Sequence, residues 1–252
     1  MNPDWIIPDW PAPAAVRAFS TTRAGGFSTG PWEGLNLGSN CSDTPDTVRL
    51  NRAQLREELP ADPCWLHQVH GVTVLRHRAD HAGQGTARAR DIRPEADAQV
   101  CRRAGLVCAI LTADCLPVLF CNRAGTTVAA AHAGWRGLAA GILERTVVFM
   151  DEPPDEILAW LGPAIGPAAY EVGEEVRREF LHRDPGAAAA FQSQGERWLL
   201  DLCQVARQRL ASVGVSAIYG GAWCTYSDAT RFYSHRRDGI TGRMASLVWL
   251  RE

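Results

Sequence analysis

Two apolar segments joined by a short polar turn constrain the fold of this chain most, because together they predict a β-hairpin. The first segment spans 106–121, the turn is Asn-Arg-Ala-Gly at 122–125, and the second segment runs into His132. A two-residue turn inside that tetrapeptide would place Cys115 directly opposite His132, with Cβ atoms about 4.5–5.5 Å apart. Pro117 cannot donate to a strand ladder, so a bulge there would shift the register by one residue. The sequence therefore predicts a thiol and an imidazole close enough to share a metal ion or a proton.

Composition limits the function classes that remain open. The chain has 252 residues, enough for one large domain, and we expect residues 1–252 to form a single domain because no Pro/Gly/Ser-rich linker divides them. The formal net charge is −2, and all 26 basic residues are arginine. Without lysine, neither a Schiff base nor a P-loop lysine is available. Without a basic surplus, we expect no nucleic-acid partner.

The N-terminal residues and the cysteines both predict a cytoplasmic protein. The segment 1–10 lacks the basic region and apolar core of a signal peptide, and no apolar stretch reaches the length of a spanning helix, so no membrane partner is expected. The eight cysteines contain no Cys-x-x-Cys pair and are scattered through apolar runs, which is typical of buried thiols in a reducing compartment. No protein partner can be read from the sequence.

Hydrophobic periodicity favours an α+β fold of mixed sheets flanked by helices in a layered sandwich. Besides the hairpin, the strand-like runs are 16–21, 65–76, 157–161, 215–219 and 246–250. The predicted helices are 47–59 capped by Asp46, 134–150, 167–181 opened by a proline, and 202–213 capped by Asp201.

Three side chains could form a metal site with one open position. They are Cys115, His132 and either His67 or His70, which face opposite ways in an extended strand. We favour His70, because Gly71 after it marks a strand end where a side chain can turn into a cleft. Thiolate and imidazole suit Zn²⁺, or copper where copper is available, and three ligands leave a fourth site for water. The plainer alternative is that these residues only pack in the core, because scattered ligands are less specific than a Cys-x-x-Cys framework.

Two arginines could hold an anionic substrate. Arg136 lies in the first turn of the helix that follows His132, where a cation opposes the helix dipole, so it suggests an anionic partner. Arg23 lies in a glycine-containing loop at 21–30 whose backbone could approach a ligand closely. The alternatives are an ion pair with a structural carboxylate for Arg136 and a plain surface turn for the loop.

Five motifs together resemble a known bacterial family: Thr-Ala-Asp-Cys at 112–115, His-Ala-Gly-Trp-Arg-Gly at 132–137, His-Gln-Val-His-Gly at 67–71, Leu-Gly-Pro-Ala-Ile-Gly at 161–166 and Tyr-Ser-His-Arg-Arg-Asp-Gly at 233–239. The family was first described as a multicopper polyphenol oxidoreductase (laccase) domain and later as purine nucleoside phosphorylases of the same fold. The resemblance extends from Thr21 to Trp249. It implies a compact α+β sandwich and zinc ligands at His70, Cys115 and His132. It also implies phosphorolysis of adenosine, inosine and S-methyl-5′-thioadenosine, plus deamination of adenosine.

The first hypothesis is therefore a zinc-dependent purine nucleoside enzyme whose partners are purine nucleosides and phosphate. For deamination, the metal would lower the pKa of a water that attacks purine C6, with Asp114 as a proton shuttle or as a partner of the ligand Cys115. For phosphorolysis, Arg23 and Arg136 would hold phosphate against C1′ while the purine leaves.

Three other hypotheses use the same residues. Copper-dependent phenol oxidation follows from the older family name, but a multicopper laccase also needs a separate histidine-rich cluster, which seven scattered histidines do not suggest. A Cys-His hydrolase would use Cys115 as nucleophile and His132 as base. The fourth is a binding module whose fold is stapled by the metal.

Overall fold

The central strands are apolar throughout because both faces of their sheet are buried. Successive side chains of a strand point to opposite faces, so every position then lies in a core. The computed structural model describes residues 2–77 and 93–252. In that part of the chain, a six-stranded mixed sheet has the order β11-β7-β5-β6-β3-β2. Only the two outermost pairs, β11 with β7 and β2 with β3, are parallel. These strands are β2 (Val74–Arg76), β3 (Ala98–Cys101), β5 (Leu116–Asn122), β6 (Val128–Ala133), β7 (Ile157–Leu161) and β11 (Ala217–Gly220).

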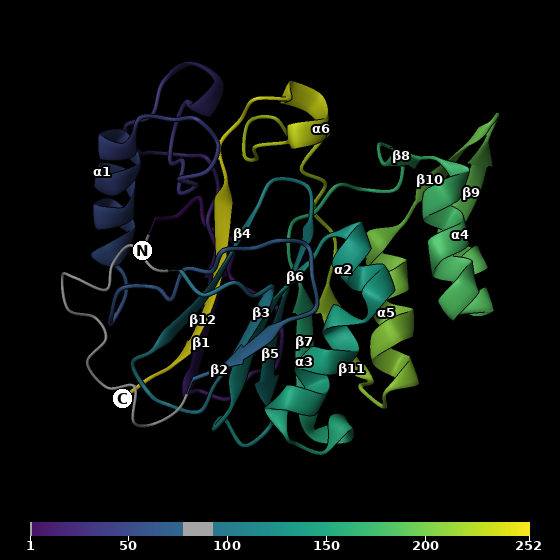
Figure 1. Cartoon of the computed structure of the whole chain (residues 1–252). Coiled ribbons are helices and arrows are strands. Elements are labelled where there is room, and N and C mark those ends of the chain that lie inside the picture. Colours follow the sequence, from purple (N-terminus) through teal and green to yellow (C-terminus); the bar gives the residue numbers. More distant parts are fainter. Residues whose placement is uncertain (1, 78–92) are drawn as a thin grey trace.

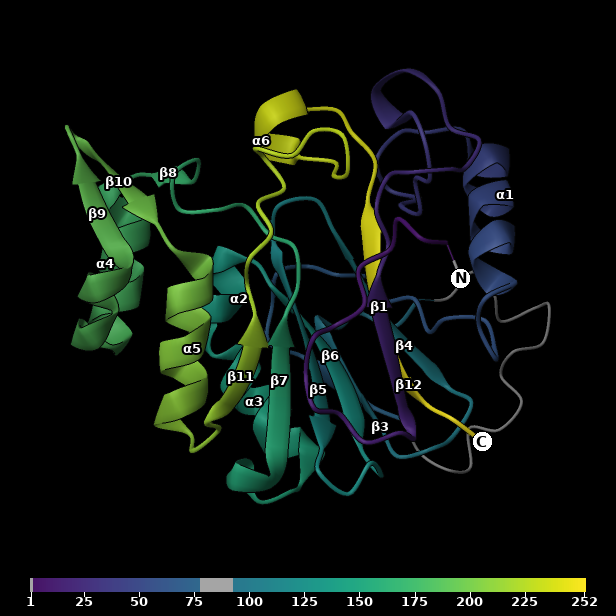
Figure 2. The same cartoon turned by 180° about the vertical axis from the view of Figure 1, so that it is seen from behind.

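One face of this sheet packs on a second, three-stranded antiparallel sheet of order β1-β12-β4 (Figures 1 and 2). Leu119 and Cys121 of β5 contribute to a buried cluster shared with Ile110 and Val248 of the smaller sheet. The helix α1 covers the outer side of that sheet through Leu55. These elements are β1 (Val16–Ser20), β4 (Val107–Thr112), β12 (Met244–Leu250) and α1 (Pro45–Arg56).

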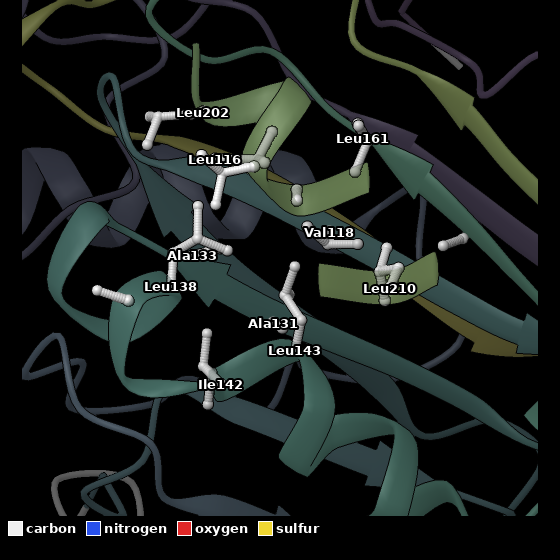
Figure 3. Packing of buried hydrophobic residues seen from close by; sticks show 14 of the residues in the cluster. Leu116, Val118, Ala131, Ala133, Leu138, Ile142, Leu143, Leu161, Leu202 and Leu210 are labelled. Carbon is white, nitrogen blue, oxygen red and sulfur yellow. The ribbon is translucent and has the colours of Figure 1, made fainter. Parts of the chain in front are cut away.

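The opposite face of the six-stranded sheet packs on three helices. Val118 of β5 and Ala131 of β6 meet Leu138, Leu143 and Leu210 in the cluster drawn in Figure 3. The residues of β5 thus alternate between two cores, which is the period-2 pattern expected of a strand buried on both sides. The helices are α2 (Trp135–Ala140), α3 (Ile142–Met150) and α5 (Leu202–Ser212).

A small third sheet, of order β8-β10-β9, projects from one side of the molecule together with α4 (Figure 1). Phe180 and Phe191 pack against each other there, with ring centroids 5.7 Å apart. The elements are β8 (Glu171–Val172), α4 (Glu174–Arg183), β9 (Phe191–Gln194) and β10 (Arg197–Leu200). Within residues 2–77 and 93–252, the remaining helices are α6 (His235–Asp238) and the 3₁₀ turns η1 (Gly30–Trp32), η3 (Pro154–Glu156) and η4 (Pro185–Ala190).

This architecture confirms the predicted α+β class, in one domain of layered mixed sheets with helices outside. Asp201 caps α5 as predicted, since its Oδ1 accepts the backbone N–H of Gln204 at 2.9 Å. No helix in the described part of the chain combines the length and apolar character that crossing a bilayer requires.

Several predicted element boundaries are wrong. The helix predicted over 134–150 is two helices, because Gly141 adopts a left-handed φ of 97° between α2 and α3. The helix predicted over 167–181 begins only at Glu174, and residues 171–172 form β8 instead. The helix predicted after Asp46 begins at Pro45 with Thr44 as its N-cap. Of the strand predicted over 65–76, only 74–76 forms a strand, and His67 adds an isolated β-bridge.

Candidate metal centre

The hairpin of β5 and β6 forms, but its register differs from the prediction by two residues. Pro117, and not Cys115, faces His132, and Cys121 faces Val128. The loop holds four residues because the Asn122 side-chain oxygen accepts two successive N–H groups, from residues 126 and 127. A shift of two keeps every side chain on its predicted face, since the strand period is two. Cys115 and His132 therefore still meet although they are not paired.

The chain passes from β4 to β5, and so from one sheet to the other, through a turn centred on Asp114. This residue has a φ of 93°, and its backbone carbonyl accepts the N–H of Ile165 at 2.9 Å. Asp114 is 8% exposed, and its carboxylate is fully engaged: Oδ1 accepts the hydroxyl of Thr225 at 2.6 Å, and Oδ2 accepts the N–H of Arg236 at 2.6 Å. Asp114 thus fixes two distant loops beside Cys115.

Three donor atoms converge at the end of this hairpin. His70, Cys115 and His132 each offer one ligand atom, and the three atoms lie within 4.8 Å of one another. The Cys115 sulfur lies 3.7 Å from Nε2 of His70, and the two imidazole rings meet edge to face with centroids 4.7 Å apart. His132 is buried while His70 is exposed, so the group opens to solvent on the His70 side.

A buried carboxylate that sequence reasoning missed holds two members of the group. Asp97 has no exposed surface, and its Oδ1 accepts Nδ1–H of His132 at 2.8 Å. The same carboxylate accepts the backbone N–H groups of Val69, His70 and Gly71 at 3.2, 2.9 and 2.7 Å. His70 has a φ of 61°, a conformation that these bonds hold in place. The available signal was an acidic residue at the head of the apolar run 96–101.

Mutual electrostatics set the charge state of the group. Burial alone would raise the pKa of Cys115, but the charge of His132 and hydrogen bonds from both imidazoles lower it to about 6. Burial would lower the pKa of His132, but the Cys115 thiolate and the Asp97 hydrogen bond raise it to about 9. Burial likewise opposes ionisation of Asp97, but bonds from His132 and Gly71 bring its pKa below the ordinary value. At neutral pH the group is a thiolate beside an imidazolium.

The donor set fits a zinc-type ion on two grounds. One thiolate and two imidazoles are the ligands that Zn²⁺ prefers, and Asp97 directs Nε2 of His132 to the centre by occupying Nδ1. The backbone also leaves room for the side chains of the group, because residue 134 is a glycine. A Cβ at this position would stand only 2.8 Å from the His70 ring and 2.9 Å from the Cys115 sulfur. A glycine is therefore required where α2 begins if the three ligands are to share an ion.

The structure separates the other candidates. Arg136 is exposed in the first turn of α2, with its guanidinium stacked 4.4 Å from the centre of the Trp135 ring. Arg23 is engaged elsewhere: its guanidinium donates to the carbonyls of Glu33 and Ala229 and lies over another ring, Tyr233. His67, the alternative to His70, is not in the ligand group. Its backbone forms an isolated β-bridge with that of Glu95.

The fold and this site define an α+β protein with a His-Cys-His metal-ligand group at the end of a central hairpin. The chain belongs to the family described as multi-copper polyphenol oxidoreductase laccase, whose model matches residues 17–251. It is 55% identical over 247 residues to purine nucleoside phosphorylase YfiH of Escherichia coli, covering 97% of this chain and 98% of the relative. It is 53% identical over 250 residues to purine nucleoside phosphorylase PA4543 of Pseudomonas aeruginosa, covering 98% and 99%.

A solved structure confirms the fold. The crystal structure of Neisseria meningitidis protein NMB0706 matches with a TM-score of 0.91 and 46% identity, over 99% of this chain and 100% of that one. The resemblance noted from the five sequence motifs is thereby confirmed at the level of family and fold.

Proposed function

We propose that this chain is a zinc-dependent purine nucleoside phosphorylase that acts on adenosine, inosine and S-methyl-5′-thioadenosine and also deaminates adenosine. The observation that carries the proposal is the convergence of His70, Cys115 and His132. Its support is the near full-length similarity to relatives named purine nucleoside phosphorylase. We propose that residues 1–252 act as one domain in the cytoplasm, where a reducing medium keeps the Cys115 thiolate available.

The residues of the group would hold the metal as three protein ligands. Zn²⁺ fits best, with copper as the alternative ion, because both accept thiolate and imidazole. When bound, the ion supplies Lewis-acid polarisation of a group at its open position.

In phosphorolysis, a phosphate oxygen forms a bond to C1′ of the ribose while the C1′–N9 bond breaks. The leaving purine takes that electron pair and then a proton, and ribose 1-phosphate is the second product. Arg136, exposed beside the centre, would neutralise the phosphate and orient it. Asp114 contributes by fixing the loops at Thr225 and Arg236, since both its oxygens are engaged there.

Product analysis tests the proposal directly. Zinc-loaded protein is incubated with adenosine in the presence and absence of phosphate, and adenine, ribose 1-phosphate and inosine are quantified. We expect phosphate-dependent adenine and phosphate-independent inosine, both lost in Cys115→Ala. The Cys41→Ala variant is the matched control, because Cys41 lies outside the ligand group. Absence of all three products would refute the proposal.

One observation favours a second candidate, a Cys-His hydrolase. The lowered pKa of Cys115 and the raised pKa of His132 describe an activated nucleophile next to a proton carrier. Metal-stripped protein would then remain active and form a covalent adduct at Cys115, which mass spectrometry detects. The nucleoside proposal requires the opposite, loss of activity on metal removal.

Polyphenol oxidation is less well supported. A multicopper laccase needs several metal sites, whereas residues 2–77 and 93–252 offer one group of three ligand-type side chains. Metal analysis distinguishes the two functions, because a laccase would bind several copper ions per chain.

A further inference from the structure

Arg236 lies beside the metal centre because Asp114, the residue before Cys115, holds its backbone. The N–H of Arg236 donates to Oδ2 of Asp114 at 2.6 Å, and the other oxygen of this buried carboxylate accepts the Thr225 hydroxyl. A charged acceptor with both oxygens satisfied is a rigid anchor. The position of Arg236 is thus tied to the turn that presents the Cys115 thiolate.

Two contacts aim the guanidinium of Arg236 and leave part of it unused. Its Nη1 donates to the carbonyl of Glu171 at 2.7 Å, and its central carbon lies 5.0 Å from the centre of the Tyr170 ring. In the part of the chain that the structure describes, Nε and Nη2 have no protein acceptor, and no carboxylate pairs with this exposed side chain. Nε and Nη2 are the pair of donors that binds two oxygens of one anion.

The charges of Cys115, Arg236 and Arg136 all influence the hydroxyl of Tyr170. Burial raises the pKa of the Tyr170 hydroxyl, the charges of Cys115 and Asp114 add to that effect, and Arg236 and Arg136 oppose it. Arg136 is also exposed: its guanidinium lies over the Trp135 ring, and among the described residues no hydrogen bond or ion pair holds it. Arg236 and Arg136 are thus both close enough to Tyr170 to influence its pKa, and Arg236 is tied through its backbone to the residue before Cys115.

Two other arginines, Arg237 and Arg23, differ from Arg236 because protein acceptors occupy their donors. Arg237 uses its donors on the carbonyls of Thr225, Tyr226 and Phe232 and on the carboxylate of Asp238. Arg23 is similarly engaged with backbone carbonyls. Both of these arginines tie loops together, whereas Arg236 keeps donors for a ligand.

We infer that Arg236, together with Arg136, binds a tetrahedral oxyanion of the phosphate class beside Cys115, and that Asp114 and Tyr170 are positioning residues for Arg236. This assignment rests on the proposed phosphorolysis and gives the role predicted for Arg23 to Arg236. The anion held there is the nucleophile that attacks C1′, so its binding is separate from recognition of the purine.

The test is an Arg236→Gln variant of the full-length, zinc-loaded protein. We expect the KM for inorganic phosphate to rise at least about tenfold, because a charge-assisted bidentate contact is lost. The KM for the nucleoside and the zinc content should not change. Inorganic phosphate should raise the Tm of the parent protein, relative to chloride at equal ionic strength, and fail to raise that of the variant.

Three further variants separate anion binding from folding. Arg178→Gln removes a surface arginine whose side chain is 74% exposed, so it should not change the KM for phosphate. Tyr170→Ala should raise that KM, whereas Tyr170→Phe, which keeps the ring under the guanidinium, should not.

The outcomes distinguish this inference from the proposed function. Phosphorolysis with an unchanged phosphate KM in Arg236→Gln overturns the inference and leaves the function standing. Stabilisation of the parent by phosphate, lost in Arg236→Gln but without any phosphorolysis, supports the anion site and removes the function. If phosphate neither stabilises the parent nor drives a reaction, both are wrong.

Discussion

Oδ1 of Asp97 lies 2.8 Å from Nδ1 of His132, and the backbone carbonyl of Asp97 also accepts the N–H of His132 at 2.7 Å. Side chain and main chain of one residue thus fix both the position and the tautomer of a ligand. The same carboxylate also accepts the backbone N–H groups of His70 and Gly71, and so holds the segment that carries His70. A single buried acid therefore links two ligands that are 62 positions apart in the sequence, from 70 to 132.

Replacing Asp97 with Asn tests this linkage. The amide nitrogen of Asn cannot accept the N–H groups at 69–71, so that segment loosens and the His132 tautomer is no longer fixed. We expect zinc affinity to fall about 10- to 100-fold, the usual effect of losing such a partner. Competition with a chromophoric chelator measures it. Asp46→Asn, at a side chain that is 85% exposed, is the control and should bind zinc normally. Equal affinities in the two variants would contradict the role given to Asp97.

Replacing Gly134 with Ala tests the space around the ligands. The backbone there has a φ of −64°, so alanine is tolerated locally, but its Cβ would fall within 3 Å of His70 and Cys115. We expect loss of stoichiometric zinc binding by a protein whose circular dichroism spectrum is unchanged. Gly186→Ala, at a glycine in η4 of the side projection, should retain its zinc. Full zinc occupancy in Gly134→Ala would show that the ligands converge differently.

Replacing Phe120 with Ala tests the double-sided packing of β5. Phe120 is fully buried in the central strand, so the change should lower the free energy of unfolding by about 3–5 kcal/mol. Val148, which is 71% exposed on α3, is the control: Val148→Ala should change stability by less than about 0.5 kcal/mol. Urea unfolding of the metal-free variants gives both values. Similar losses in the two variants would mean that the sheet is not the stabilising core.

Strand periodicity was sufficient to predict the layers that position the centre. The runs at 16–21, 157–161 and 246–250 form β1, β7 and β12: β7 and β12 are buried throughout, and β1 buries Val16 and Phe19. The sheet of β8, β9 and β10 was not predicted, since its strands are short and partly polar. The break at Gly141 was also missed, because the apolar period continues through it into α3.

The grouping of Cys115 and His132 could be predicted from the sequence, whereas the residues that hold them in place could not. Proximity of Cys115 and His132 follows from the hairpin, and any even register shift preserves it. The register itself depended on hydrogen bonds that the Asn122 side-chain oxygen accepts, which no periodicity reveals. Asp97 and Arg236 act through contacts with residues 35 and 122 positions away, so local patterns carry no trace of them.

The pH dependence of alkylation in the metal-free protein tests the thiolate at Cys115. Only the thiolate reacts with iodoacetamide, so the rate rises as pH increases through the pKa of the thiol. With a pKa of about 6, Cys115 should reach half its limiting rate near pH 6 and react fully at pH 7. Burial raises the pKa of Cys64 to about 11 and that of Cys203 to about 12, so these thiols stay protonated and unreactive at that pH.

Peptide mass spectrometry assigns the modified residue at each pH. His132→Gln removes the imidazolium but leaves the burial, so the inflection should move upward, past the ordinary value of about 8.5. Zinc should protect Cys115 in the parent protein, since a coordinated sulfur no longer attacks. An inflection of the parent above pH 8 would mean that His132 does not stabilise the thiolate.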